Sequence, residues 1–299
     1  MSRFVFDDIL VDPRRQASGG RTASPHGARR NGSSPPAPPG PRDRLELFRR
    51  SLGEWRLAHQ QAPILTYHRL TDRTGTHPCS IRVARFRGHL ALLRRLGYRA
   101  VSPVVLADAL RRGAPVPART VAITFDDGYV DTLAVALPLL QEFGFTATCY
   151  VVVGAVGQSS HWADPAPLMD WEGIRAWLGA GMDIGSHSMS HPDLTTLTDF
   201  GLRAEVTRSR VWLEDRLGVA VRSFAYPFNR LNRRALDAVA EAGYTAGCAG
   251  AELHGSPHAL SRMDVAHESW LWFSLQLWRA YPALRGAYRA AFPRSAPAA

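Results

Sequence analysis

The feature that most constrains the fold is an alternation of short apolar runs with amphipathic segments, which begins near residue 60. The apolar runs have strand length, and the segments between them carry apolar residues at helical spacing. Ser102-Pro103 and Asp170 are typical of helix starts, and Gly144 of a helix end. This alternation predicts an α/β fold with parallel strands, either open or closed into a barrel. The predicted strands are 64–67, 121–125, 147–153, 182–185, 223–226 and 244–249.

Composition divides the chain into three parts. At 45% hydrophobic residues, it can bury a sizeable core. Residues 13–41 are rich in Pro, Gly, Ser and Arg and cannot bury enough apolar surface to offset their ordering entropy. We therefore expect a mostly disordered N-terminal tail and linker over 1–59, one folded domain over 60–268, and a C-terminal helix and tail over 269–299.

The net charge of +10 resides in the ends of the chain rather than in the predicted domain. All 36 basic residues are Arg; 1–60 hold 11 of them against 6 acids, and 270–299 hold 4 against none. A nucleic-acid-binding protein carries its basic stripe on the folded domain, so this distribution argues against a nucleic-acid partner.

Cysteine usage and the ends of the chain bear on location. Cys79, Cys149 and Cys248 are odd in number and widely spaced, so no disulfide framework or zinc finger is predicted. The start of the chain lacks a signal-peptide pattern, and no run of 18 apolar residues predicts a transmembrane span. The sequence thus predicts a cytoplasmic protein. The Trp-rich segment from Ser269 is expected to pack on the domain; peripheral contact with a membrane surface is the alternative.

Two acids follow the apolar run that ends at Phe125. Asp126 and Asp127 precede Gly128, a pattern that usually marks only a turn. Here the pair follows a predicted parallel strand and precedes a helix, and the carboxyl ends of such strands carry the active sites of α/β proteins. Neighbouring strand residues point in opposite directions, but both acids can reach one site where the strand breaks into a loop.

Two histidines follow another predicted strand end. His187 and His191 are four residues apart, which puts both imidazoles on one helical face or in one tight loop, within reach of one ion. His254 and His258 have the same spacing but lie in a loop and not directly at a strand end, and they are interpreted as surface histidines. One carboxylate with two imidazoles leaves coordination positions open, as in a catalytic metal site. The second aspartate would supply a base for hydrolysis.

The motifs around these residues resemble the polysaccharide deacetylases, also known as the NodB-homology domain of carbohydrate esterase family 4. The resemblance covers about residues 60–268. It rests on Thr-Phe-Asp-Asp-Gly at 124–128, Gly-Ser-His-x-x-x-His-Pro-x-Leu at 185–194, Phe-Ala-Tyr-Pro-Phe at 224–228, Tyr67-His68-Arg69 and Trp171. The third motif is similar to the branch that acts on exopolysaccharides such as poly-N-acetylglucosamine.

The resemblance implies an irregular (β/α) barrel and a role for each matching residue. Asp126 matches the catalytic base, and Asp127, His187 and His191 match the ligands of a divalent metal, most often zinc. Phe228 matches the residue whose backbone N–H helps to stabilise the oxyanion. The implied reaction removes an acetyl group from an N-acetylated sugar or polysaccharide. Tyr226, Trp171 and His68 are the further residues expected at the substrate site.

Several positions depart from the family pattern. Ala225 stands where relatives often carry an Arg that tunes the catalytic aspartate; Arg222 is expected either to substitute for that Arg in part or to be a surface arginine. Asn229 replaces a common Gly, which the tolerance of Asn for left-handed backbone accommodates. The family's closing Leu-x-Leu-His motif, source of the general acid, is not recognisable. His68, His254 and His258 are the candidates for that role.

Two other functions stay open on the sequence alone. A carbohydrate-binding relative without catalysis would fit the unrecognised general acid and the missing Arg. A metal-dependent O-acetyl esterase or cyclic amidase would keep the site and change the bond that is cleaved.

Overall fold

The computed structural model of the chain describes residues 62–72, 79–162, 165–250 and 255–265, together with Trp270, Phe273, Ser274 and Leu277. The predicted N-terminal tail, His254 and most of the predicted C-terminal helix lie outside the described residues. None of the helices in these ranges combines the length and the apolar character that a membrane span needs.

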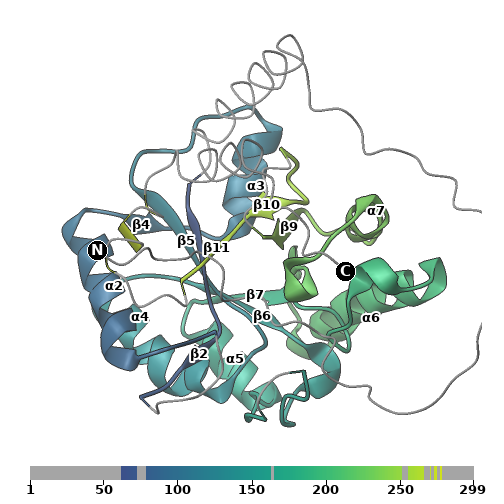
Figure 1. Cartoon of the computed structure of the whole chain (residues 1–299), viewed down its shortest axis with the longest axis horizontal. Coiled ribbons are helices and arrows are strands. Elements are labelled where there is room, and N and C mark those ends of the chain that lie inside the picture. Colours follow the sequence, from purple (N-terminus) through teal and green to yellow (C-terminus); the bar gives the residue numbers. More distant parts are fainter. Residues whose placement is uncertain are drawn as a thin grey trace, which may run out of the picture.

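A parallel sheet forms the centre of the molecule (Figure 1). Its strands lie in the order β10-β9-β8-β7-β6-β5-β1-β11, and every neighbouring pair is parallel. The α/β class and the parallel arrangement predicted from the alternation are therefore confirmed. These strands are β1 (Ile64–Tyr67), β5 (Thr120–Phe125), β6 (Thr148–Val151), β7 (Asp183–Ser186), β8 (Ser223–Ala225), β9 (Ala246–Ala249), β10 (Leu260–Ser261) and β11 (Met263–Asp264).

One short segment brings the two edges of this sheet together into a nearly closed barrel. β10 pairs with β9, and β11 pairs with β1, yet only Arg262 separates the two strands in the chain. The implied barrel is therefore confirmed, and its closing segment is the part that sequence periodicity did not predict. Three further strands are β4 (Arg99–Ala100), which also pairs with β5, and the separate pair β2 (Arg69–Leu70) and β3 (Ser80–Ile81).

Helices surround the barrel, with α2 and α4 at one edge and α6 and α7 at the other (Figure 1). Ser102 and Asp170 precede α3 and α5 as predicted, and the Asp170 carboxylate accepts the N–H of Gly173. Gly144 ends α4 in the left-handed conformation. The helices are α2 (Val83–Arg95), α3 (Pro103–Arg111), α4 (Leu137–Phe143), α5 (Trp171–Gly179), α6 (Asp199–Leu217) and α7 (Arg233–Glu241). A π-helical segment, η1 (Thr132–Ala136), leads into α4, and η2 (Val153–Ala155), η3 (Leu194–Thr196) and η4 (Pro227–Asn229) are single 3-10 turns.

Tyr150 of β6 is fully buried and requires a glycine beside it. A Cβ added at Gly185 would lie 2.3 Å from the Tyr150 ring. The Tyr150 hydroxyl lies 3.2 Å from the Cys248 sulfur, and the Arg262 guanidinium lies over the ring. Cys149 and Cys248 are free and buried, as expected of core residues.

The described residues of the C-terminal segment pack against α2. Phe273 and Leu277 are buried, and the Phe273 ring stacks on His89 with centroids 3.6 Å apart. These contacts agree with the expected packing on the domain.

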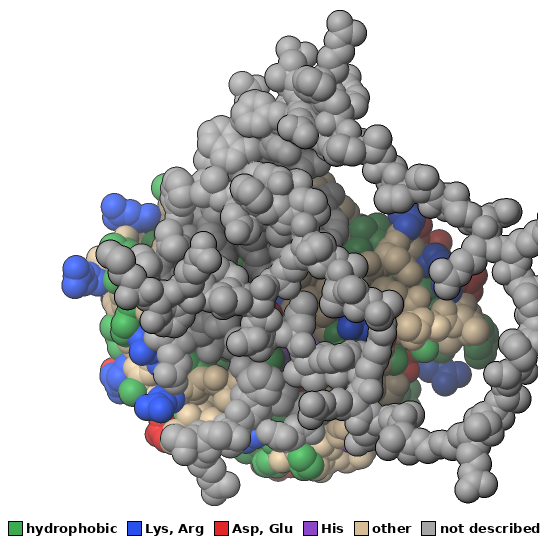
Figure 2. All heavy atoms as spheres, in the orientation of Figure 1, with side chains coloured by type: hydrophobic (Ala, Val, Ile, Leu, Met, Phe, Trp, Pro, Cys, Tyr) green, Lys and Arg blue, Asp and Glu red, His purple; other side chains and the backbone are tan. Residues whose placement is uncertain are grey.

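In Figure 2, basic side chains lie along the edge where Figure 1 places α2. Arg87 of α2 binds Glu142 of α4 with two hydrogen bonds, at 2.5 and 2.7 Å.

Candidate active site

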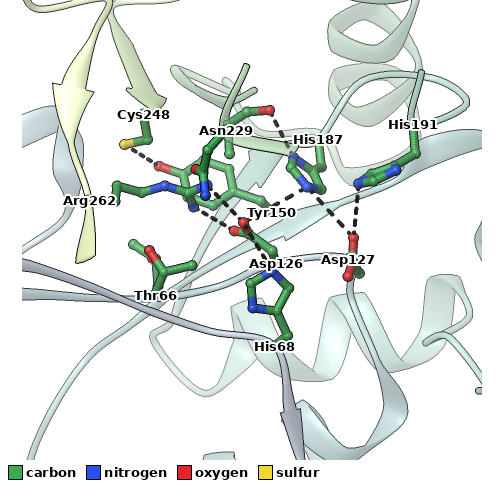
Figure 3. A network of polar contacts seen from close by, with 12 residues as sticks. Thr66, His68, Asp126, Asp127, Tyr150, His187, His191, Asn229, Cys248 and Arg262 are labelled. Atoms are coloured by element: carbon green, nitrogen blue, oxygen red, sulfur yellow. Dashed lines mark hydrogen bonds and ion pairs between the residues drawn. The ribbon is translucent and has the colours of Figure 1, made fainter. Parts of the chain in front are cut away.

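Backbone hydrogen bonds carry the strand ladders past the strand ends and so fix three residues of the site. The N–H of Asp126 donates to the Tyr67 carbonyl at 2.9 Å, and the N–H of His187 to the Val151 carbonyl at 2.9 Å. Arg262 is held in the same way, through the Ala249 carbonyl at 3.0 Å. The side chains that follow these strands converge at one end of the barrel (Figure 3).

A left-handed residue explains how both adjacent acids reach this site. Asp127 has φ 72°, and Gly128 follows with φ 83°. A non-glycine residue pays about 1–2 kcal/mol for this conformation, so the surrounding structure must hold it. Both carboxylates are buried. The break after β5 therefore turns the Asp127 side chain toward the same space as that of Asp126, as expected.

The two predicted histidines lie in a tight turn, which decides between the two geometries that their spacing allowed. Ser188 and His191 have φ 68° and 60°, so the segment after β7 is not helical. The N–H of His191 donates to the Ser188 hydroxyl at 3.0 Å. The turn brings both imidazoles to Asp127 (Figure 3).

Asp127, His187 and His191 present one ligand atom each within 4.8 Å of one another. The Asp127 Oδ1 lies 3.6 Å from the His187 Nε2 and 3.4 Å from the His191 Nε2. Two atoms bound to one ion at about 2.1 Å are about 3.4 Å apart at a tetrahedral angle. The spacing therefore fits a divalent ion between the three groups.

Hydrogen bonding gives an independent reason for a cation at this point. The His187 Nδ1 lies 2.8 Å from the carbonyl of Ala225, which can only accept, so Nδ1 carries the proton. The His187 Nε2 is then the ring nitrogen that faces the Asp127 Oδ1, which is buried and has no hydrogen-bond partner among the described residues. Burial, with His187 beside it, lowers the pKa of His191 to about 2 and keeps that imidazole neutral. A buried carboxylate oxygen without a partner in the described part of the chain, close to two imidazole nitrogens, is therefore a suitable place for a cation.

Asp126 lies beside this group and is bound by an arginine that the sequence did not indicate. The Arg262 guanidinium donates to both oxygens of Asp126, at 2.6 and 2.8 Å, and to the Asn229 side-chain oxygen at 2.8 Å (Figure 3). Asn229 has φ 54°, the left-handed conformation expected of it. Arg222 is exposed just before β8, so of the two alternatives the structure supports the surface arginine and not the substitute.

The buried ion pair sets the protonation of Asp126. Burial alone would raise the pKa of this carboxyl, but Arg262, with smaller contributions from His187 and His68, holds the pKa well below its usual range. Asp126 is therefore ionised at neutral pH. A buried carboxylate in this state can accept a proton when a reacting group approaches.

His68 and Phe228 lie around the same centre. The His68 Nε2 lies 3.8 Å from the Asp126 Oδ2, and its side chain is 16% exposed. The Phe228 ring is exposed and meets His191 edge-on, while the Trp162 ring stacks on the face of His191, each with centroids 4.6 Å apart. Trp162 has no sequence motif that would have indicated it.

The remaining predicted residues lie apart from this group. The Tyr226 side chain is fully buried and donates its hydroxyl to the His258 carbonyl, so the expectation of a substrate contact by this side chain is corrected. Trp171 begins α5, with the Arg216 guanidinium over its ring. The His258 Nε2 lies 2.9 Å from the carbonyl of Tyr244, at the opposite end of the strands, so His258 is a half-buried structural residue.

Comparisons with known proteins agree with this fold and site. The model of the polysaccharide deacetylase family matches residues 113–247. This range includes Asp126, Asp127, His187 and His191. The Bacillus subtilis (strain 168) protein YxkH, whose name assigns it provisionally to the polysaccharide deacetylases, is 28% identical over 187 residues, or 62% of this chain and 63% of that protein. The poly-β-1,6-N-acetyl-D-glucosamine N-deacetylase of Escherichia coli (strain K12) is 29% identical over 179 residues, or 56% of this chain and 25% of the relative.

A solved structure extends the likeness to three dimensions. The Streptococcus pyogenes deacetylase PplD, in complex with acetate, superimposes with a TM-score of 0.61 at 25% identity, over 68% of this chain and 91% of that one. Over residues 113–247 this chain therefore matches the polysaccharide deacetylase family, whose members are hydrolases that act on carbon–nitrogen bonds other than peptide bonds. It spans less than two thirds of the length of the two relatives named above.

Proposed function

We propose that this chain is a metal-dependent N-deacetylase that removes acetyl groups from an N-acetylated amino sugar in an oligosaccharide or polysaccharide. The observation that carries the proposal is the three-ligand group with a separate, ionised Asp126 beside it. The family supports deacetylation, and the name of the E. coli relative supports an N-acetylglucosamine polymer as the substrate class.

Asp127, His187 and His191 would hold the metal, for which zinc is the best choice because two imidazoles and one carboxylate suit it. When bound, a divalent ion supplies Lewis-acid polarisation of the acetamide carbonyl and lowers the pKa of an attacking water. The chain's own residues must then provide the proton transfers and help to stabilise charge on the carbonyl oxygen.

Asp126 is the proposed general base. Its carboxylate would accept a proton from water as the oxygen of that water attacks the acetamide carbon. Arg262 keeps it ionised and fixes both oxygens, so no reorganisation is needed. The Phe228 backbone N–H is the proposed donor to the carbonyl oxygen as its negative charge develops.

His68 is the proposed general acid. Cleavage of the carbon–nitrogen bond leaves an amine that needs a proton, and His68 is a partly exposed titratable group beside Asp126. The proton taken by Asp126 can restore the His68 proton across the short gap between them. Acetate and a free amino sugar are the products, and the site returns to its starting protonation.

The test measures metal content and amine release together on the purified full chain. N-acetylglucosamine oligomers with β-1,6 and β-1,4 linkages are incubated with the zinc-loaded protein, the chelator-treated protein and the His187→Ala variant. We expect primary amine and acetate in equal amounts from the zinc-loaded protein alone. His258→Gln, at the other end of the strands, is the matched histidine control and should retain both zinc and activity.

Other results would replace the proposal. Acetate release from O-acetylated but not N-acetylated sugars would assign an esterase. A zinc-loaded protein that binds these oligomers without turnover, unaffected by Asp126→Asn, would assign a carbohydrate-binding protein.

A further inference from the structure

The two histidines of the site are held in different ways. The His187 ring is oriented by the hydrogen bond from its Nδ1 to the Ala225 carbonyl, which leaves Nε2 facing Asp127. The His191 Nδ1 is buried too, but within the described ranges it has no hydrogen-bond partner. Metal-binding histidines usually donate their second ring nitrogen to a fixed acceptor. The position of His191 must therefore depend on its backbone and on the rings that pack against it.

The hydrogen bond from the His191 N–H to the Ser188 hydroxyl holds only part of that backbone turn. Ser188 and His191 both have left-handed φ values, which side chains other than glycine adopt only when the surroundings impose them. Between them, Met189 and Ser190 present two successive backbone N–H groups toward α6. The turn needs acceptors for these groups from outside its own sequence.

Glu205 of α6 supplies them. Its Oε2 accepts the N–H groups of Met189 and Ser190, both at 2.9 Å, and its Oε1 accepts the Ser190 hydroxyl at 2.7 Å. On the other side of the turn, the Gly154 N–H donates to the Met189 carbonyl at 2.7 Å. A Cβ at Gly154 would lie 2.7 Å from that carbonyl oxygen, so this approach requires glycine.

The helix that carries Glu205 is itself fixed to the barrel. Leu202 and Val206, on either side of Glu205, are buried in the main core. One turn further along, the Ser209 hydroxyl lies 2.8 Å from that of Ser186, the last residue of β7. Glu205 therefore reaches the turn from a helix tied to the same strand that positions His187.

We propose that Glu205 is a positioning residue that holds the turn between His187 and His191 and so keeps the His191 Nε2 at its distance from Asp127. It contacts the turn and none of the three candidate ligands. The proposal rests on the metal site of the proposed function, and it adds the group that pre-organises one ligand. The consequence is that the affinity for the ion depends on a residue of α6 that never touches the ion.

The acceptor geometry, and not the charge alone, is what this role requires. In Glu205→Gln the amide oxygen can still accept both backbone N–H groups, and the amide NH₂ can donate to the Ser190 oxygen. In Glu205→Ala both N–H groups lose their acceptor. The conservative variant should therefore retain the function that alanine loses.

The experiment measures the zinc dissociation constant of the full chain by competition with a chromophoric chelator. Removing a residue that orients a metal ligand without touching the ion weakens metal binding by about 10–100-fold. We expect a loss of this size for Glu205→Ala. Glu205→Gln should stay within about 3-fold of the wild type, by the same acceptor argument. Glu241→Ala is the matched control, because Glu241 pairs with Arg203 on the surface of α6 and α7. At saturating zinc, kcat of Glu205→Ala should recover, since the residue touches no substrate.

A second readout needs no metal. Hydrogen exchange of the Met189 and Ser190 amides in the zinc-free protein should be slow in the wild type and in Glu205→Gln, and fast in Glu205→Ala. If alanine prevents folding, Ser190→Ala removes only the hydroxyl bond and should accelerate the same exchange more mildly.

The outcomes separate the two proposals. Zinc affinity equal to wild type in a folded Glu205→Ala protein, or equal losses in the Gln and Ala variants, would overturn the role of Glu205. A wild-type protein that binds no divalent ion, but shows the expected exchange pattern, would overturn the metal site of the proposed function and leave the turn contact standing.

Discussion

The guanidinium of Arg262 donates hydrogen bonds to both carboxylate oxygens of Asp126, at 2.6 and 2.8 Å, although the two residues are 136 positions apart in the chain. Both side chains are almost completely buried, at 1% and 3% exposed. Arg262 reaches this position because it is the single residue between β10 and β11, where the chain passes from one edge of the barrel to the other.

Replacing Arg262 should impair Asp126 as the proposed general base. In Arg262→Ala, burial of Asp126 is no longer offset, so the pKa of this carboxyl rises and the ionised fraction falls. We expect kcat/KM at pH 7 to drop about 100-fold or more, and its acid limb to move to higher pH. Breaking a buried pair also costs about 3–5 kcal/mol of unfolding free energy.

The pH profile of kcat/KM, measured with denaturant unfolding on the same preparations, checks this prediction. Arg262→Lys should retain part of the activity, because an ammonium keeps the charge but cannot bind both oxygens in the same way. Arg222→Ala is the matched control on the exposed start of β8 and should leave the profile unchanged. A normal acid limb in Arg262→Ala would show that Asp126 does not depend on the ion pair.

Most strands and helices could be predicted because each has a signal within its own stretch of sequence. Phe125 ends an apolar run, and the helix cap at Asp170 is visible from residue type alone. β10 and β11 are only two residues long, too short for any period, so the closure of the barrel could not be predicted. Arg262 was missed for the same reason, since its partner is fixed only by the closed barrel.

The residues of the candidate site fall into the same two groups, those with a local sequence signal and those without one. Asp127, His187 and His191 each follow a recognisable strand end or stand in a specific motif, so their convergence was predictable. The contacts of Glu205 and Trp162 arise from folding and leave no pattern in the sequence. Tyr226 shows the converse: its motif position suggested a substrate contact, but strand alternation turns its side chain into the core.

His68→Gln should impair departure of the amine more than binding of the substrate. Gln keeps the size and polarity of the side chain but cannot transfer a proton. General acids contribute about 100- to 10,000-fold, so kcat should fall by at least about 100-fold with little change in KM. Steady-state kinetics on an N-acetylated sugar oligomer and on an activated acetate ester separate the steps, because an ester with a good leaving group needs no acid. Equal losses on both substrates would contradict this role.

Phe228→Ala should affect KM rather than kcat. The ring is 51% exposed and packs edge-on against His191, whereas the proposed oxyanion donor is the backbone N–H, which alanine retains. We expect KM for a sugar oligomer to rise several-fold, in line with the loss of an aromatic contact worth about 1 kcal/mol, and kcat to stay within about 3-fold. Phe228→Gly is the companion variant, because φ 56° is left-handed and glycine relieves it. A loss of kcat in Phe228→Ala that Phe228→Gly does not share would point to backbone strain instead.

His89 of α2 links the stability of the fold to pH. Its Nδ1 lies 3.1 Å from the Tyr67 hydroxyl and its ring stacks on Phe273; burial, helped by Arg85, lowers the pKa of His89 to about 3. In the unfolded chain the pKa of His89 is about 6.5, the value of an unperturbed histidine. Above that pH, His89 is therefore neutral in both the folded and the unfolded state. As pH falls from 6.5 toward 3, only the unfolded state gains a proton, and the folded state loses about 1.4 kcal/mol per pH unit from this group.

His89→Phe keeps the stacked ring but has no proton to gain. Urea unfolding at pH 8 and pH 5 should therefore show about 2 kcal/mol more acid destabilisation in the wild type than in the variant. Equal losses in the two proteins would mean that His89 is already protonated in the fold.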